Sequence, residues 1–375
     1  MTAPGVEPAV ALATLRHRDG LYQAGIPGYT SNFSRDGFTY GLLANDLDAL
    51  RAQLRFSARH QGQRADPETG EEPGKIHHEL PGVRQDGLWT TYDACDSTAL
   101  FLLAIAHVAA HGGDDLQRRY RSCIERALEY LRSHLIDDVF HEDTRQSDAD
   151  HFALKVTYWK DSELNLPGPE KAARYPIAYA LVHFQYVAAL RAMADLMEST
   201  ELANQADSLT ERGLEAFWRG DHFAVAVRGD AVVADATSSD SLHTLLFLEP
   251  GTIDSGRLAL VEPYSEPLAT PFGYLPALPV AADVDPYHTR YVWVHEQALL
   301  YAAANRHGLR RAMEIAARVM PAFEHGFPEL IDPENGSPIA GNRTQLWSVG
   351  AYLYFERSGS RADASGGADQ RASRS

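Results

Sequence analysis

Residues 97–110 read Ser-Thr-Ala-Leu-Phe-Leu-Leu-Ala-Ile-Ala-His-Val-Ala-Ala, so a helix formed here has apolar side chains on every face. Such a helix has to be buried on all sides. The next stretch, residues 114–135, carries a single apolar stripe that includes Leu116, Ile124 and Leu131. A helix with one stripe buries one face only. The two stretches together predict an inner helix covered by an outer one.

The same contrast recurs along the whole chain. Helices that should be fully buried are predicted at residues 37–44, 97–110, 172–197, 239–248, 290–305 and 344–355. Their striped partners are predicted at residues 46–61, 114–135, 203–217, 254–261, 309–323 and, for the last buried helix, 8–22. We therefore expect an all-α fold, an (α/α)6 toroid of six helical hairpins in two concentric rings. A ring-shaped core also allows one domain to exceed the usual size of a single core.

The remaining segments are short. Residues 222–234 alternate small and β-branched side chains around a Gly-Asp turn, which predicts a minor β-hairpin. Residues 358–375 consist mainly of Ser, Gly, Ala, Arg and Asp, and such a composition buries too little apolar surface to order the chain. We expect one catalytic domain over residues 1–357 and a disordered C-terminal tail over residues 358–375.

Composition restricts the possible partners and compartment. Hydrophobic residues make up 45% and charged residues 23%, as in soluble globular proteins, and no apolar run reaches the roughly 18 residues of a membrane span. The start of the chain lacks the pattern of a secretory signal. The only cysteines, Cys95 and Cys123, fit a reducing compartment. A net charge of −17 disfavours nucleic acid and anionic lipid. We expect a cytoplasmic protein that binds neither.

Polar and aromatic side chains gather in the loops before the predicted buried helices. In a toroid these loops open at one end, where helix N-termini offer free N–H groups to carboxylates and sugar hydroxyls. Ser97, Asp240 and Thr344 are explained by N-capping alone. The others are candidates for substrate contact: Arg35, Asp36, Glu79, Trp89, Asp96, Trp159, Lys160, Asp161, Trp293, Glu296, Glu329, Gln345 and Trp347. Carboxylates can act as acid and base, and aromatic rings can stack on sugars.

The chain also contains a set of short motifs in a fixed order: Ala24-Gly25-Ile26-Pro27, Phe33-Ser34-Arg35-Asp36, Gly74-Lys75-Ile76-His77-His78-Glu79, Tyr92 with Asp96-Ser97-Thr98, Trp159-Lys160-Asp161-Ser162, Thr270-Pro271-Phe272-Gly273-Tyr274 and Gln345-Leu346-Trp347-Ser348. In these motifs the chain resembles the six-hairpin glycosidases, and within them the amylo-α-1,6-glucosidase part of glycogen-debranching enzymes. The resemblance runs from about residue 24 to residue 355. It departs from the family pattern at Gly28, Ser34 and Ala99.

The resemblance implies an inverting glycoside hydrolase that cleaves an α-linked glucosyl oligosaccharide or a small glycoside. Asp161 then matches the general acid, and Glu329 matches the general base. Arg35 and Asp36 match residues that hold the sugar at the cleavage site. Inversion requires about 6.5–9.5 Å between the two carboxyl groups, which leaves room for a water molecule.

Each catalytic role carries a further expectation. Asp161 has to stay protonated near neutral pH, which requires burial against Trp159 or a nearby like charge. We therefore expect the Lys160 amine to point away from Asp161. Glu296 is the alternative candidate for the base, and Glu334 is a third, weaker candidate.

Two alternatives stay open at this point. A sugar epimerase or isomerase on the same toroid would use histidines as acid and base, with His77, His78, His243, His288 and His295 as candidates. A non-catalytic carbohydrate-binding toroid would bind a sugar without cleaving it. We expect no cofactor and no metal, because the chain has no Gly-rich phosphate loop and no His-Glu-x-x-His spacing. The nucleophile motif Gly-x-Ser-x-Gly is also missing.

Overall fold

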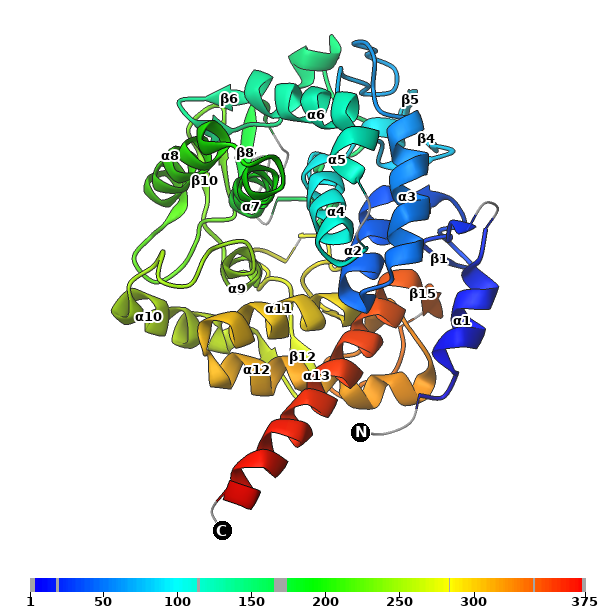
Figure 1. The fold of residues 1–375 in the computed structure, drawn as a ribbon, viewed down its shortest axis with the longest axis vertical. Helices are drawn as coiled ribbons and strands as arrows, with labels where there is room; N and C mark the ends of the chain where they lie inside the picture. Colours follow the sequence, from blue (N-terminus) through cyan, green and yellow to red (C-terminus); the bar gives the residue numbers. More distant parts are fainter. Residues whose placement is uncertain are drawn as a thin grey trace.

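The computed structural model describes residues 4–17, 20–112, 115–164, 174–282, 284–339 and 341–372. The expected starts of two helices, at residues 114 and 172, lie outside these ranges. The described residues form one closed ring of helices seen end-on in Figure 1. The predicted (α/α)6 toroid is confirmed.

The inner ring surrounds the barrel axis. Within the described residues it consists of α2 (Ser34–Ala44), α4 (Ser97–Gly112), α7 (Ala180–Met197), α9 (Asp240–Leu245), α11 (Val294–His307) and α13 (Leu346–Ala372). Each inner helix packs against the next, and α13 packs against α2, so the ring closes. In α4 the side chains of Ala99, Leu100, Phe101 and Leu102 are all buried, although four successive residues point to different sides of a helix. The burial predicted from the sequence is therefore observed.

The outer ring covers these helices with single apolar stripes. It consists of α1 (Pro8–Leu15), α3 (Leu47–Arg59), α5 (Leu116–Arg119) with α6 (Arg121–Ser133), α8 (Thr200–Phe217), α10 (Ser255–Ser265) and α12 (Arg310–Ala316), which continues into the 3-10 helix η6 (Ala317–His325). Helix α1 packs against α13, as expected for the hairpin that closes the ring. It is shorter than predicted, because the chain turns back after Leu15 and Arg16 pairs with Tyr22.

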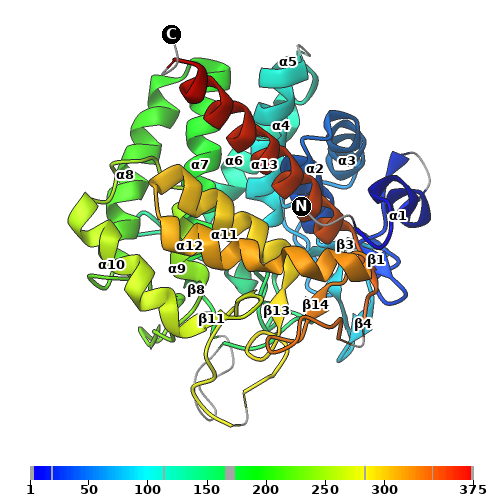
Figure 2. The same ribbon diagram turned by 90° about the horizontal axis from the view of Figure 1, so that it is seen from below.

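Short strands tie the loops together at one end of the barrel (Figure 2). Four lie directly before inner helices: β2 (Asn32–Phe33), β8 (Ile177–Tyr179), β13 (Val292–Trp293) and β15 (Thr344–Gln345). Their antiparallel partners are β3 (Glu79–Leu80), β9 (Ala226–Arg228), β14 (Leu330–Ile331) and β1 (Gly25–Ile26). Helix α11 begins at Val294 and not at residue 290 because the preceding residues form β13. These pairs bring loops from distant parts of the sequence side by side.

Several smaller elements complete the described fold. The predicted hairpin is present as β9 with β10 (Val233–Ala234), and β8 adds a third strand to it. The other elements are β4 (Arg84–Gln85), β5 (Leu88–Trp89), β6 (Leu135–Ile136), β7 (Val139–Phe140), β11 (Ala269–Thr270), β12 (Gly273–Tyr274) and the 3-10 helices η2 (Thr90–Tyr92), η3 (Thr144–Ser147) and η5 (Glu266–Leu268).

Two further expectations concern the order of residues 358–375 and the presence of membrane-spanning helices. Helix α13 continues to Ala372, so the structure assigns helix to most of residues 358–375; the disorder expected there stays a prediction. None of the helices in the described ranges combines the length and the apolar composition that crossing a membrane requires.

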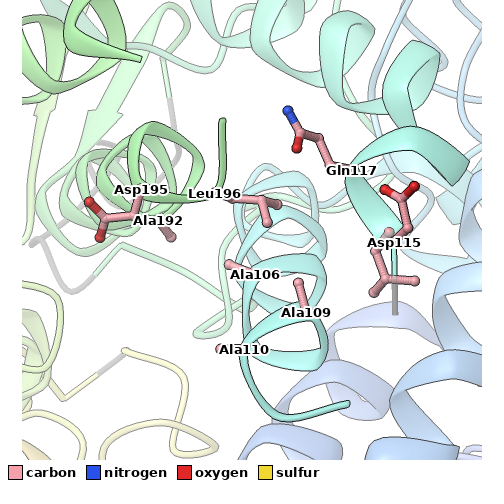
Figure 3. Close-up of a pocket in the computed structure, with 9 residues that line it drawn as sticks. Ala106, Ala109, Ala110, Asp115, Gln117, Ala192, Asp195 and Leu196 are labelled. Carbon is pink, nitrogen blue, oxygen red and sulfur yellow. The ribbon is translucent and has the colours of Figure 1, made fainter. Parts of the chain in front are cut away.

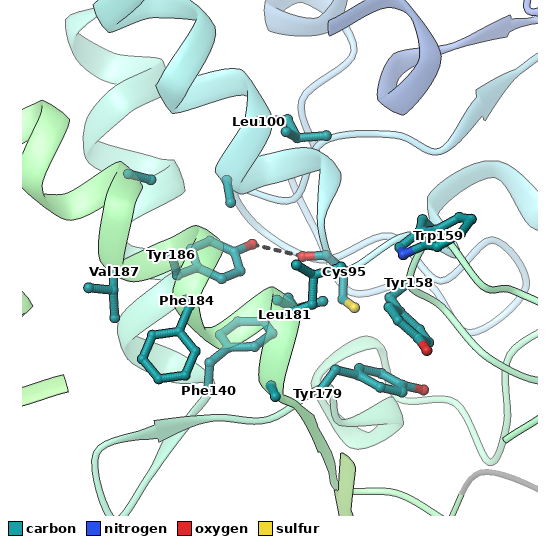
Figure 4. Close-up of a cluster of buried hydrophobic side chains, with 14 of the residues drawn as sticks. Cys95, Leu100, Phe140, Tyr158, Trp159, Tyr179, Leu181, Phe184, Tyr186 and Val187 are labelled. Atoms are coloured by element: carbon teal, nitrogen blue, oxygen red, sulfur yellow. Dashed lines mark hydrogen bonds between the residues drawn. The ribbon is translucent and has the colours of Figure 1, made fainter. Parts of the chain in front are cut away.

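An aromatic cluster in the core holds the chain in place at Thr157 and Tyr158 (Figure 4). Tyr158 stacks on Tyr179 with ring centroids 4.6 Å apart. The Tyr186 hydroxyl donates to the Cys95 carbonyl at 3.1 Å, and the Cys95 N–H donates to the Thr157 carbonyl at 2.9 Å. Because Thr157 and Tyr158 are held in this way, the residues that follow them enter the loop end of the barrel in a defined position.

Candidate active site

A cavity of about 520 Å³ opens at the loop end of the barrel. This volume lies within the roughly 300–1,000 Å³ range of small-molecule sites. Most residues predicted to act on a substrate line it, namely Arg35, Asp36, Glu79, Trp159, Asp161, Trp293, Glu329, Gln345 and Trp347. The prediction that loops far apart in sequence share one opening is therefore confirmed.

A larger hollow of about 700 Å³ lies elsewhere, between α4, α5 and α7 (Figure 3). Four of its nine lining residues are alanines, including Ala106 and Ala110. Its polar residues, Asp115, Gln117 and Asp195, are exposed. A site for a polar ligand needs polar groups that converge in a partly buried space, so the smaller cavity is the better candidate.

Asp161 lies beside a buried arginine at the wall of the cavity. Its Oδ2 is 3.6 Å from Nη1 of Arg35, which also forms an ion pair through Nε with Oδ2 of Asp96 at 2.7 Å. Burial raises the pKa of Asp161 to about 6; Arg35 opposes this shift and the negative charge of Asp96 adds to it. The side chain keeps 30% exposure where it faces the cavity. Asp161 can therefore hold a proton close to neutral pH.

Glu329 lies directly before β14 and is held by two hydrogen-bond donors. The Tyr287 hydroxyl donates to Oε1 at 3.0 Å, and Nδ2 of Asn342 donates to Oε2 at 3.0 Å. Burial raises the pKa of Glu329 to about 7, although both hydrogen bonds lower it, and the charge of Asp161 raises it further. Asp161 and Glu329 thus lie within electrostatic reach of each other. The pair can hold a single proton near neutrality.

Three tryptophans form an aromatic wall of the cavity. Trp159 and Trp293 meet edge to face with centroids 5.7 Å apart, and Trp293 and Trp347 meet in the same manner at 5.8 Å. His295 stacks on Trp347 at 3.7 Å. The packing fixes the ring planes, and the apolar faces are suited to the C–H surfaces of a sugar.

The lining of the cavity is also rich in carboxyl groups. Gln345 donates through Nε2 to Oδ1 of Asp36 at 3.1 Å. Thr90 donates its hydroxyl to Glu79. Burial raises the pKa of Glu79 to about 7 and that of Asp36 well above its ordinary value. These groups can accept hydrogen bonds from the hydroxyls of a neutral ligand.

Two predicted contact residues, Trp89 and Asp96, lie outside the lining of this cavity. Trp89 is 37% exposed on β5, beside the guanidinium of Arg84 at 5.7 Å from the ring. Asp96 is buried behind Arg35 and binds it. Asp96 therefore holds Arg35 in place and does not contact a ligand in this cavity.

Lys160 and Glu296 also lie outside the lining of this cavity, because both side chains belong to one buried cluster. The Lys160 amine donates to the Ser238 hydroxyl at 2.7 Å and lies 2.8 Å from Oδ1 of Asp240. Glu296 accepts a hydrogen bond from Ser239 in the same buried cluster. The expectation that Lys160 points away from Asp161 is confirmed. Lys160 and Asp161 are neighbours in the chain, but the Lys160 side chain enters the buried cluster while Asp161 lines the cavity.

Asp240, His243 and Glu296 form a group with the residue types of a metal site. Their potential ligand atoms lie within 4.8 Å of one another, and all three residues are buried. The Lys160 amine beside Asp240 already supplies positive charge to this group. It also lowers the pKa of Glu296, which burial raises to about 7. We therefore assign no metal to these residues.

Tyr287 and Asn342 hold Glu329 but were not among the predicted site residues. Both lie in loops that precede inner helices, which is the signal that could have selected them. Tyr29 extends this set, because its hydroxyl lies 3.2 Å from that of Tyr287. A sequence motif identifies the carboxylate but not the neighbouring residues that donate hydrogen bonds to it.

The histidines proposed for an epimerase are buried, and burial lowers the pKa of each. Burial lowers the pKa of His77 to about 3 and that of His243 to about 4, and it lowers the pKa values of His78, His288 and His295 well below the ordinary range. Of the five, His78 alone lines the cavity. A histidine acid would need a protonated ring, which these surroundings disfavour.

Comparisons with known proteins agree on the architecture. No family model and no curated protein matches the sequence. Among solved structures, a GH63 mannosylglycerate hydrolase from Thermus thermophilus in complex with Tris superposes with a TM-score of 0.68 at 14% identity, over 94% of this chain and 100% of that one. The chain has the six-hairpin glycosidase fold. A rhamnosidase from Klebsiella oxytoca with rhamnose bound matches with a TM-score of 0.60 at 14% identity, over 94% of this chain and 62% of that one.

The six-hairpin glycosidase fold also occurs in a protein described only as a glycosidase, which matches with a TM-score of 0.61 at 16% identity over 92% of this chain and 93% of that one. At these sequence identities the matches establish a shared fold and nothing further. The finer resemblance, to the amylo-α-1,6-glucosidase part of debranching enzymes, is not confirmed by these matches.

Proposed function

We propose that this protein is an inverting glycosidase that cleaves an α-linked glucosyl oligosaccharide or a small glycoside. The proposal depends on Asp161 and Glu329, which face one cavity and have pKa values raised towards neutrality. Solved structures with the same fold, described as a mannosylglycerate hydrolase and a rhamnosidase, support the reaction class.

The proposed reaction adds water across the bond between the sugar and its leaving group. Asp161, protonated, gives its proton to the glycosidic oxygen as the bond from that oxygen to the anomeric carbon breaks. A water molecule attacks the anomeric carbon from the opposite face, and Glu329 takes a proton from it. The released sugar has inverted configuration. Tyr287 and Asn342 keep the carboxylate of Glu329 in place for the water.

The charges of the cavity favour a neutral sugar. Its lining includes the carboxyl groups of Asp36, Glu79 and Asp285 in addition to the catalytic pair, against the cations of Arg35 and Lys155. A ligand with several negative charges would be repelled by this excess. The α-linked glucosyl unit, as cleaved by debranching enzymes, is the finer part of the proposal and comes from the sequence resemblance.

Product analysis tests the proposal. The purified protein is incubated with α-linked gluco- and manno-oligosaccharides and mannosylglycerate, and the first product is followed by proton NMR. We expect a free sugar whose anomeric configuration is inverted. Retention of configuration would overturn the mechanism, and an isomer of unchanged mass would favour an epimerase. Binding without cleavage of any substrate would favour a carbohydrate-binding toroid.

Activity should follow a bell-shaped pH profile with limbs near pH 6 and pH 7. Below the lower limb both carboxyl groups are protonated and the base is lost; above the upper limb both are ionised and the acid is lost. The two pKa values that such a profile gives belong to the coupled pair of carboxyl groups. The shape of the profile therefore does not show which residue is the acid. In this structure Glu329 has the higher pKa, so the assignment of the acid to Asp161 comes from the resemblance. A profile of kcat/KM that stays flat from pH 5 to 8 would contradict the pair.

Tyr287→Phe should move the alkaline limb of this profile upward, because Glu329 has the higher pKa of the pair. The tyrosine hydroxyl donates to Glu329 and lowers its pKa, so its removal raises the pH at which the base ionises. Tyr29→Phe is the matched control, because Tyr29 contacts Tyr287 and not Glu329 itself. If both variants leave the alkaline limb in place, Glu329 is not the group that titrates there.

A further inference from the structure

The loop before β13 contacts both segments that carry the proposed catalytic pair. Tyr287 and His288 are neighbours in this loop. The Tyr287 hydroxyl donates to Oε1 of Glu329 at 3.0 Å. Nδ1 of His288 shares a hydrogen bond of 2.8 Å with Oγ of Ser162, the residue that follows Asp161. Consecutive residues of one loop therefore reach the base and the segment that carries the acid.

The His288 ring is fixed by the aromatic wall of the cavity. It is buried and stacks on Trp293, with ring centroids 4.7 Å apart and ring planes 6° from parallel. It also meets Trp159 edge to face, at 5.6 Å between centroids. Packing against two indoles restricts the rotation of the ring, as the side chains that support a site require. Nδ1 is therefore presented to Ser162 in a defined direction.

The loop is held by hydrogen bonds of its own. The Tyr287 N–H donates to Oδ1 of Asp285 at 2.8 Å, and the Thr289 hydroxyl donates to the Asp285 carbonyl at 2.9 Å. The indole N–H of Trp293 donates to the Tyr287 carbonyl at 3.1 Å, which ties the loop to β13. A loop braced in this way provides a fixed support for the two segments that it contacts.

The carboxyl group of Asp161 is held differently from that of Glu329. Glu329 accepts hydrogen bonds directly from Tyr287 and Asn342. Asp161 lies 3.6 Å from Nη1 of Arg35, which is beyond the usual length of a hydrogen bond. The position of Asp161 therefore depends also on the chain that carries it, and the next residue in that chain is bonded to the loop before β13.

We propose that His288 is a positioning residue, which holds Asp161 in place through its hydrogen bond with Ser162. Together with Tyr287 it sets the distance between the acid and the base. The inference rests on the proposed glycosidase function. A general acid has to lie within hydrogen-bond reach of the oxygen that it protonates, and a displacement of about 1 Å can cost about 10²-fold in rate. Loss of the hydrogen bond should therefore affect proton donation first.

Two variants remove this hydrogen bond from its two ends. Ser162→Ala takes away the hydroxyl, and His288→Phe keeps an aromatic ring against Trp293 but takes away Nδ1. Each should lower kcat by about 10- to 100-fold for glycosides with alkyl or sugar leaving groups. The loss should be smaller for a nitrophenyl glycoside, whose leaving group departs without a proton. The double variant should lose no more than the single ones, because both changes remove the same contact.

His288→Asn separates the hydrogen bond from the packing of the ring. An asparagine amide can donate or accept a hydrogen bond near the position of Nδ1, but it does not stack on Trp293 as the imidazole does. We expect His288→Asn to retain more activity on alkyl glycosides than His288→Phe. Ser162→Ala decides the matter if the histidine variants do not fold, since Ser162 is only partly buried.

Asp161→Asn, measured beside these variants, separates this inference from the proposed function. If Asp161→Asn depends on the leaving group and Ser162→Ala does not, the positioning role alone is overturned. A direct contact between the substrate and Ser162, which lines the cavity, would weaken activity on both kinds of glycoside equally. The positioning role is also overturned if Ser162→Ala keeps full activity, or if His288→Asn is no better than His288→Phe. If Asp161→Asn shows no dependence on the leaving group, the assignment of the acid fails and the inference fails with it.

Ser133→Ala is the matched control for the loss of a serine hydroxyl. The Ser133 hydroxyl donates to the Tyr130 carbonyl at 2.9 Å, at the end of the outer helix α6. This variant should leave kcat unchanged for both kinds of glycoside.

Discussion

Replacing Asp161 with asparagine is expected to lower kcat by about 10²–10⁴-fold, the usual contribution of a general acid. Asparagine keeps the shape of the side chain but cannot protonate the leaving oxygen. The loss should be largest for glycosides with alkyl or sugar leaving groups, and smaller for a nitrophenyl glycoside, whose leaving group departs without a proton. Steady-state kinetics on both kinds of glycoside measure the difference. The fold should be unaffected, because Asp161 lies at a cavity wall.

Glu329→Gln should lower kcat by a similar factor for both kinds of glycoside, because the attacking water needs its base whatever the leaving group. Glu334→Gln is the matched control, since Glu334 is exposed on a turn near the same loop. Glu296→Gln tests the rival base, which is buried outside the cavity. If the leaving group matters for Glu329→Gln and not for Asp161→Asn, the two roles are exchanged. If Glu296→Gln alone abolishes activity, the pair proposed here is wrong.

The ring architecture could be predicted because burial leaves a direct mark on the sequence. A helix such as α4, covered on every side, needs apolar residues at every position, whereas an outer helix such as α6 needs a single stripe. The boundaries were harder to predict. Val292 and Trp293 look like the first turn of a helix, yet pairing with Leu330 and Ile331 makes them a strand. Such pairing joins distant segments, and local periodicity does not contain it.

The candidate site could be predicted to the level of loops but not of side-chain directions. The resemblance selected Asp161 and Glu329, and both face the cavity. Lys160 comes from the same motif as Asp161 and points the other way, into a cluster with Asp240. The direction of a side chain in a loop depends on backbone angles and on partners far away in sequence. Tyr287 was missed for the same reason, since its contact with Glu329 is a tertiary one.

Lys75 shows how a motif can serve the fold and not the site. It belongs to the stretch that resembles the glycosidases, yet its side chain is fully buried between two carboxylates. Its amine lies 2.8 Å from Oε1 of Glu72 and 2.8 Å from Oε1 of Glu142. His134 binds the other oxygen of Glu72 at 2.6 Å, and the Tyr130 hydroxyl donates to Glu142 at 3.2 Å. The cluster joins the loop before α4 to the segments that follow α6.

Lys75→Met is expected to destabilise the protein by about 3–5 kcal/mol, the usual cost of removing one partner from a buried ion pair. Methionine fills much of the same space, so loss of the charge and not a void accounts for the effect. Without the amine, Glu72 and Glu142 face each other without a lysine between them, and burial favours the protonated form of each. The free energy of unfolding, measured by urea denaturation, reports the loss.

The pH dependence of this loss separates the charge effect from a packing effect. Carboxyl groups whose pKa is raised in the folded variant take up protons as the pH falls, and each proton relieves the repulsion between Glu72 and Glu142. The destabilisation should therefore shrink between pH 8 and pH 5. Lys155→Met is the matched control, because its ion pair with Glu163 is 3.4 Å long and Lys155 is 68% exposed. Exposed pairs contribute about 0–1 kcal/mol. A loss for Lys75→Met as small as that of the control, or one independent of pH, would show that the buried amine does not hold these segments together.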